Sequence, residues 1–145
     1  VADLRGTFEV NEGELMRFLA EAPWYPTALL PGQGVSWAPI DARSARATLA
    51  DGSLTVTMTF RFGDDGLIET VRADARGRTV GGEVVQTPWQ GRFWNYQDVH
   101  GLRVPFYGEV AWLLPDGPYP YWLGHIVDIA WDWDAPTWPE RCPIV

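Results

Sequence analysis

The N-terminal part of the chain has the hydrophobic pattern of one amphipathic helix. Within residues 11–22, apolar side chains recur at helical spacing, which marks one buried stripe. The stripe consists of Leu15, Phe18, Leu19 and Ala22. Pro23 ends the helix, because proline cannot donate the backbone hydrogen bond that a helix interior needs. Residues 26–31 begin and end with proline, which predicts a short second helix and therefore an N-terminal helical hairpin.

From residue 35 onward the hydrophobic period changes to two, which is typical of strands with one buried face. Residues 53–62 are the clearest case, because apolar side chains alternate with threonine and arginine. Turn signals at residues 64–66 (Asp-Asp-Gly) and 81–82 (Gly-Gly) separate the strands. Residues 87–91 are interpreted as a loop or bulge. The predicted strands cover residues 35–40, 45–49, 53–62, 67–73, 83–86, 92–99, 102–105 with 107–114, and 121–133.

These elements predict an α+β fold built on a strongly curved antiparallel sheet of about eight strands. We expect a half-barrel or barrel-like sheet with the helical hairpin at one end or in its mouth. Pro105, Gly108 and Gly124 interrupt strand patterns and indicate bulges, which help a sheet to curl. The length suits one domain, predicted over residues 1–134, followed by an irregular proline-rich tail over residues 135–145.

Tryptophan is the unusual feature of the composition, with nine residues in a chain of 145. Burying one indole removes on the order of 150–250 Å² of surface from water. A small domain has room for only a few such rings in a solid core. We therefore expect the other rings to line a cavity, a groove or an interface.

The charge pattern excludes several classes of function. The net charge is −8, and all eleven basic residues are arginines. An acidic chain without a basic run is a poor partner for nucleic acid or for an anionic membrane surface. The absence of lysine excludes Schiff-base chemistry and the lysine of a phosphate-binding loop.

The sequence shows no targeting or membrane-spanning segment. Cys142 is the only cysteine, so no intramolecular disulfide can form; this leaves the redox compartment open and favours the cytoplasm. No apolar run approaches the ~18 residues of a membrane span, and no signal-peptide pattern is present. The start at Val1 suggests a processed product or a fragment.

Several uncommon runs of residues, in a fixed order, resemble a family of uncharacterised bacterial proteins of actinobacterial type, a domain of unknown function. The runs are residues 13–31 (GELMRFLAEAPWYPTALLP), 37–49 (WAPIDARSARATL), 87–91 (TPWQG), 108–112 (GEVAW) and 114–124 (LPDGPYPYWLG). Members of that family are about twice as long, so the resemblance implies that this chain is their C-terminal half. It supplies a fold and a boundary, but no mechanism. The sheet-plus-helix pattern is also similar to the half-barrel lipoprotein carriers, by analogy only.

The chain departs from the family at two positions after the Tyr-Trp pair. Leu123 and His125 stand where the resemblance implies arginine. This version has therefore lost two positive charges beside an aromatic strand.

Glu109 is the first candidate for catalysis. It lies in an apolar aromatic strand, where a carboxyl group is expected to have the raised pKa that a general acid or base needs. Tyr107 precedes it by two residues, and His125 could pair with it from a neighbouring strand. The structural alternative is an ion pair across the sheet with Arg61, Arg92 or Arg103.

The aromatic set provides candidates for ligand binding, because loops on a rigid sheet are where binding residues gather. We expect indole and phenol rings to form the walls, and Arg61 or Arg92, together with Glu109, to orient a polar head. The predicted ligand-binding residues are Trp24, Tyr25, Arg61, Trp89, Arg92, Trp94, Trp112, Tyr121 and Trp122.

Metal and nucleophile chemistry find no support in the sequence. Two histidines without a cysteine cluster give no zinc spacing. Asp128, Asp132 and Asp134 alternate along one segment, but without the loop of a calcium site they are interpreted as a solvated face. No Gly-x-Ser-x-Gly motif is present. We expect no cofactor.

The leading hypothesis is the binding of a hydrophobic small molecule or lipid in an aromatic-lined cavity. One alternative is an enzyme on such a substrate, a cyclase, isomerase or hydrolase with Glu109 as general acid/base. A second alternative is an interaction module whose aromatic residues form a homodimer interface or contact a missing N-terminal half.

Overall fold

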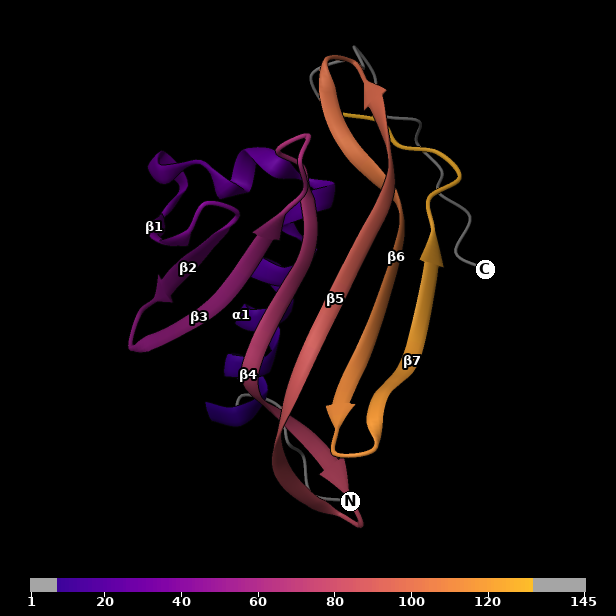
Figure 1. Ribbon diagram of the computed structural model, residues 1–145. Helices are drawn as coiled ribbons and strands as arrows, with labels where there is room; N and C mark the ends of the chain where they lie inside the picture. Colours follow the sequence, from indigo (N-terminus) through magenta and orange to yellow (C-terminus); the bar gives the residue numbers. More distant parts are fainter. Residues whose placement is uncertain (1–7, 132–145) are drawn as a thin grey trace, which may run out of the picture.

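The computed structural model describes residues 8–131 and shows one antiparallel sheet of seven strands with a single α-helix at its N-terminal side (Figure 1). Helix α1 (Phe8–Glu21) is followed by three 3-10 segments, η1 (Ala22–Trp24), η2 (Pro26–Leu29) and η3 (Pro31–Gln33). The strands are β1 (Val35–Asp41), β2 (Ser44–Asp51), β3 (Leu54–Phe62), β4 (Ile68–Val80), β5 (Glu83–Val99), β6 (Leu102–Leu114) and β7 (Gly117–His125). Each strand pairs with the next in sequence, so β1 and β7 are the two edges and the sheet is not closed.

Helix α1 forms where the sequence predicts a helix, and it begins three residues earlier, at Phe8 instead of Asn11. Met16, Leu19 and Ala20 are buried, which confirms an apolar stripe. Phe18 does not belong to the buried stripe, because it is 47% exposed. The predicted second helix is replaced by short 3-10 segments, so the helical hairpin is not confirmed.

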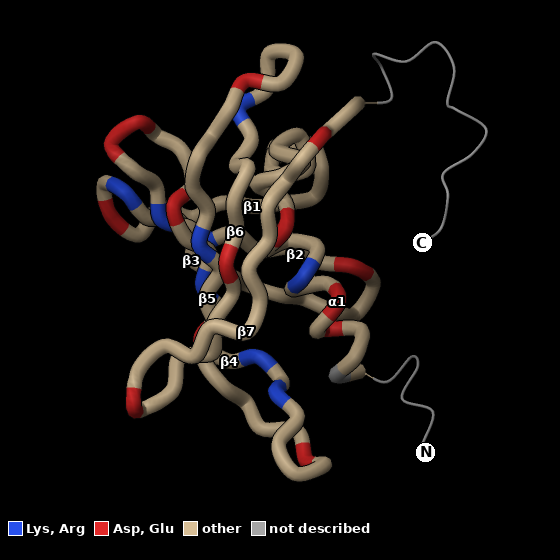
Figure 2. Tube along the Cα trace, turned by 90° about the vertical axis from the view of Figure 1, so that its right-hand side faces the viewer, with Lys and Arg blue, Asp and Glu red and all other residues tan. Residues whose placement is uncertain are grey.

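The core lies between α1 and one face of the sheet, which we call the inner face. Helix α1 contacts β3 most extensively, then β4 and β2. Within β3 the buried side chains are those of Val56, Met58 and Phe60, as the alternation over residues 53–62 predicts. The opposite, outer face of these strands carries threonine and arginine. Acidic residues lie along α1, and basic residues lie in the β4–β5 hairpin (Figure 2).

Strand β5 is longer than the sequence predicts. The segment interpreted as a loop or bulge, residues 87–91, is continuous strand, and Thr87, Trp89 and Gly91 are buried in it. The irregularity lies opposite, in β4, where the register passes from Ala73–Trp89 to Arg76–Thr87. Residue 88, a proline, falls within this shift. It has no partner in the β4–β5 or the β5–β6 register, and such an irregular position is where a strand accommodates proline.

The last strand also differs from its prediction. Strand β7 starts at Gly117 and ends at His125, whereas a strand was expected over residues 121–133. Its prolines are tolerated because β7 is an edge of the sheet. Residues 132–133, the predicted tail over 135–145 and Cys142 lie outside the described residues. Within the described part of the chain, no helix is long and apolar enough to cross a membrane.

Candidate functional site

A pocket of about 250 Å³ opens between α1 and the inner face of the C-terminal half of the sheet. Helix α1 packs mainly on β2, β3 and β4, whereas η1 contacts β6, so the inner face beyond β4 is covered less completely. Figure 1 shows α1 behind the N-terminal strands, away from β6 and β7. The pocket is lined by Arg17, Ala20, Glu21, Trp24, Arg76, Trp89, Phe93, Val110, Tyr121 and Trp122.

Trp24 lies where the helical segment meets β6, and it is fixed by a hydrogen bond and by ring contacts. Its indole Nε1 donates to the carbonyl oxygen of Pro105 at 3.0 Å. Its ring contacts Phe93 and Trp122 edge-to-face, with centroids 5.4 and 5.9 Å apart. Such aromatic pairs contribute about 0.5–1.5 kcal/mol beyond the area they bury. The wall that Trp24 forms is therefore held in place before any ligand binds.

Two glycines make room for these rings. Gly108 of β6 and Gly124 of β7 are opposite each other in the register. A Cβ atom at Gly108 would lie 2.7 Å from Cζ2 of Trp24, and one at Gly124 would overlap the ring of Trp122. Their positions within strand patterns predict a bulge at each glycine. Their physical role is the close approach of two indole rings to the sheet.

Tyr121 and Trp122 are consecutive residues, yet both line the pocket. Ordinary alternation would place them on opposite faces, but the β6–β7 register shifts between Val110 and Ala111. Tyr121 stacks on Trp112, with centroids 5.4 Å apart and planes at 18°. Its hydroxyl accepts a hydrogen bond from Nε1 of Trp89 at 2.7 Å. The bulge therefore builds a continuous aromatic wall from β5 to β7.

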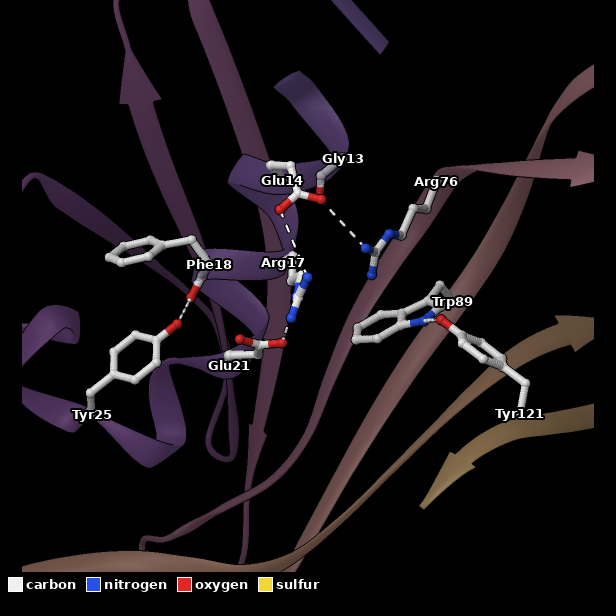
Figure 3. Close-up of polar contacts among 9 residues, drawn as sticks. All are labelled: Gly13, Glu14, Arg17, Phe18, Glu21, Tyr25, Arg76, Trp89 and Tyr121. Carbon is white, nitrogen blue, oxygen red and sulfur yellow. Dashed lines mark hydrogen bonds and ion pairs between the residues drawn. The ribbon is translucent and has the colours of Figure 1, made fainter. Parts of the chain in front are cut away.

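Arg76 reaches the pocket through the irregularity in β4. Val71 and Ala73 are buried on the inner face, so simple alternation would place residue 76 on the outer face. The register shift between Ala73 and Arg76 reverses this, and the Arg76 guanidinium lies over the Trp89 ring, 4.9 Å from its centroid. Burial lowers the pKa of Arg76 from its ordinary value. The guanidinium nevertheless stays charged, because the ordinary pKa of arginine is so high. Figure 3 shows Arg76 beside Trp89 and Tyr121.

Arg17, the other arginine of the lining, is neutralised within its own helix. Its Nε lies 2.8 Å from a carboxylate oxygen of Glu21, and its Nη1 lies 3.9 Å from Glu14 (Figure 3). The hydrogen bond and the charge of Glu21 raise the pKa of Arg17. These pairs lie near the surface, so they contribute little to stability. They do occupy the Arg17 guanidinium, whose charge is balanced by Glu21 and Glu14.

Of the predicted ligand-binding residues, Trp24, Trp89, Tyr121 and Trp122 line the pocket. Trp112 is on the same face and stacks on Tyr121, but it does not line the pocket. Arg61, on the outer face of β3, lies 3.7 Å from Glu69. The residues that the sequence analysis missed are Arg17, Ala20, Glu21, Arg76, Phe93 and Val110.

The three predicted catalytic residues come together, but on the outer face. Glu109 is opposite Arg92 in the register, and its Oε1 lies 3.6 Å from the Arg92 Nη1. Tyr107 stacks between Trp94 and His125, with centroids 5.6 and 4.4 Å away. None of these five residues lines the pocket described above. The acid–base role of Glu109 stays a prediction, and it would have to act at the outer face.

Tyr25, also predicted to bind ligand, contacts α1 instead of the pocket. Its ring lies 5.5 Å from that of Phe18, and its hydroxyl donates to the Phe18 carbonyl oxygen at 2.7 Å (Figure 3). Burial, and next the charge of Glu21, raise the pKa of Tyr25 to about 12. Tyr25 thus anchors the 3-10 segments to the helix.

This raised pKa predicts a late tyrosine titration in the folded protein. The unfolded value is about 10, so the contribution of neutral Tyr25 to stability is fully present below pH ~10 and is lost as the pH rises through about 12. We expect Tyr25→Phe to remove one late step from the titration of phenolate absorbance. Burial also raises the pKa of Tyr96, so a late step from that residue remains. Identical curves for the native and the denatured protein would contradict the prediction.

The side chains that could ligate a metal ion are not clustered in the described part of the chain. Over residues 8–131, no group of three or more histidine, cysteine, aspartate or glutamate side chains is arranged to hold a metal ion. Asp132 and Asp134, considered above for calcium, lie outside those residues.

Comparison with known proteins finds one family. Residues 1–131 match DUF6920, a family of unknown function. This match confirms the resemblance to a family of unknown function, while the actinobacterial type and the carrier analogy stay predictions. No curated protein matches the chain, and no solved structure matches it either.

Proposed function

We propose that this chain, which belongs to the DUF6920 family of unknown function, binds a hydrophobic small molecule or one end of a lipid. The observation that supports the proposal is the pocket of about 250 Å³ with aromatic walls from η1, β5 and β7. Ligand sites in proteins are concave, mostly apolar and largely pre-formed. This pocket has each of these properties.

The size of the pocket limits the ligand. Typical ligand pockets have volumes of about 300–1,000 Å³, so this pocket of about 250 Å³ is slightly smaller than the usual range. A ligand with one or two rings, or the end of one acyl chain, is the size expected. On this proposal the open sheet with its covering helix works as the half-barrel of the carrier analogy does.

The walls are organised in advance, which favours binding. Trp24 is tied to the Pro105 carbonyl and Trp89 to the Tyr121 hydroxyl. Hydrogen-bonded indoles lose little further freedom when a ligand arrives, so less of the binding free energy is spent on ordering side chains. The pocket also joins segments far apart in sequence, so a ligand would stabilise the packing of η1 on β5–β7.

A protein interface is the second candidate, because the edge strand β7 exposes apolar side chains. Tyr119 is 55% exposed and Leu123 is 67% exposed. An unpaired edge of this kind is a template for another chain. Light scattering over a range of concentrations, with and without a pocket probe, separates the two: an interface predicts a dimer that the probe does not affect.

Titration with naphthalene, a neutral apolar probe, tests the proposed pocket. We expect saturable shifts of the Trp89 and Trp122 indole signals in NMR spectra of the protein. Val110→Phe puts a ring into the space, so we expect the affinity to fall by about tenfold or more. Val84→Phe is the matched control, because Val84 is 53% exposed and does not line the pocket. Non-saturable shifts, or equal affinity in Val110→Phe and wild type, would show that the proposal is wrong.

A further inference from the structure

Arg76 gives the aromatic pocket a positive charge, and no ion pair joins it to a carboxylate in the part of the chain that the structure describes. Its guanidinium lies over Trp89 and donates a hydrogen bond of 3.5 Å to the carbonyl oxygen of Gly13. Among the described residues, no aspartate or glutamate oxygen lies within ion-pair distance of it. Arg17, by contrast, is held by Glu21 and Glu14. The charge of Arg76 therefore remains available to a ligand.

The charges of the lining support this inference. Two arginines and one glutamate line the pocket, so it carries an excess of one positive charge in a chain whose net charge is −8. Glu14 and Glu21 act on Arg76 only through longer-range attraction. A charged guanidinium held among aromatic rings is stabilised further by an anion that pairs with it.

Tyr121 provides a second polar group next to Arg76. Its hydroxyl oxygen accepts the Trp89 hydrogen bond, so its own proton can be donated to another acceptor. Arg76 and Tyr121 both line the pocket, and Figure 3 shows the guanidinium beside the Trp89 ring and the hydroxyl at the Nε1 edge of that ring. One guanidinium and one hydroxyl match the two oxygens of a monoanion. A dianion would need a further cation, and Arg17 is already paired.

We propose that the ligand is a small amphipathic carboxylate, with its carboxylate on Arg76 and the Tyr121 hydroxyl and its apolar body against Trp24, Phe93 and Trp122. This inference rests on the proposed function and specifies the chemical class of the ligand. A guanidinium suits the task, because it presents parallel N–H donors to a carboxylate and stacks on an aromatic ring at the same time.

The test compares an acid with its neutral amide of the same shape. Hydrocinnamate and hydrocinnamamide are titrated against the intact chain, and binding is followed by tryptophan fluorescence. For Arg76→Gln we expect the affinity for hydrocinnamate to fall by about tenfold to a hundredfold, because one charged hydrogen-bonded pair is lost. The affinity for hydrocinnamamide should change by less than about twofold.

Arg78→Gln is the matched control. Arg78 is on the same strand and also lies over aromatic rings, 5.9 Å from the Trp112 centroid, but it does not line the pocket. We expect this variant to bind both probes as the wild type does. An equal loss of hydrocinnamate affinity in Arg78→Gln would overturn the assignment to Arg76.

Tyr121→Phe supplies an independent variant in case Arg76→Gln does not fold. It keeps the ring stacked on Trp112 and removes only the hydroxyl, so the preference for hydrocinnamate over its amide should fall by about threefold to tenfold. If wild type binds the acid and the amide equally, the carboxylate inference is wrong while the proposed function stands. If neither of them nor naphthalene saturates the pocket, both proposals are wrong.

Discussion

Phe60→Ala is expected to lower the free energy of unfolding by about 3–5 kcal/mol. Phe60 is fully buried at 0% exposure near the C-terminal end of β3, the strand that α1 contacts most. Its ring meets Trp37 edge-to-face, with centroids 5.1 Å apart. Truncation leaves a cavity under the helix and removes this ring contact. Since a domain is stable by only about 5–15 kcal/mol, the substitution should unfold a measurable fraction of the protein.

Phe8→Ala is the matched control for this prediction, because the same ring is removed from a side chain that is 61% exposed. We expect a change of less than about 0.5 kcal/mol there. Urea denaturation followed by circular dichroism measures both variants. Equal midpoints for Phe60→Ala and Phe8→Ala would show that the core does not lie between α1 and β3.

The sequence predicts the N-terminal half of this fold well, because its two faces have different chemistry. In β3 the alternation of apolar residues with threonine and arginine indicates which face of the strand is buried, and the buried residues are those expected. Helix α1 is similarly clear from its spacing. Phe18 is the exception, because local stacking on Tyr25 replaces burial in the core. The period and polarity of the residues are enough to predict a strand's buried face where one face is exposed to solvent and the other is packed in the core.

The C-terminal half is predicted less well, because both faces of β5, β6 and β7 carry large aromatic side chains. Trp89 faces the pocket, whereas Trp94, on the same strand, faces outward and stacks on Tyr107. Composition alone does not distinguish these two environments. Trp37 packs on Phe60 in the core, whereas Trp122 lines the pocket.

The sequence predicts only part of the candidate site, because two register shifts determine which side chains face the pocket. Arg76 was expected outside any strand, and no glycine or proline at residues 74 and 75 signals the shift in β4 that turns it inward. The shift in β7 likewise brings Tyr121 and Trp122 to one face. A bulge reverses every later side chain of its strand. Glu109, in contrast, follows simple alternation to the outer face, where it pairs with Arg92, as the structural alternative in the sequence analysis allows.

The largest effect expected on the pocket itself comes from Gly124→Ala. The added methyl group would overlap the Trp122 ring, which must then leave its place against the sheet. Overpacking of this kind costs about 1–3 kcal/mol of stability. Trp122 is already 44% exposed, so its ring can move toward solvent and open one wall of the pocket. We expect tryptophan fluorescence to shift to longer wavelength and naphthalene to bind more weakly.

Two comparisons attribute that loss to the ring contact and exclude a general effect of adding a methyl group. Gly13→Ala should raise stability by about 1 kcal/mol, because Gly13 is within α1 and a Cβ there meets nothing within 4 Å. In a Trp122→Leu background the bulky ring is absent, so adding Gly124→Ala should cost less than it does in the wild type. The interaction free energy from this double-mutant cycle measures the clash directly. An interaction free energy of zero would contradict the prediction. It would mean that glycine is needed at residue 124 for its backbone conformation, and that the indole of Trp122 does not pack against it.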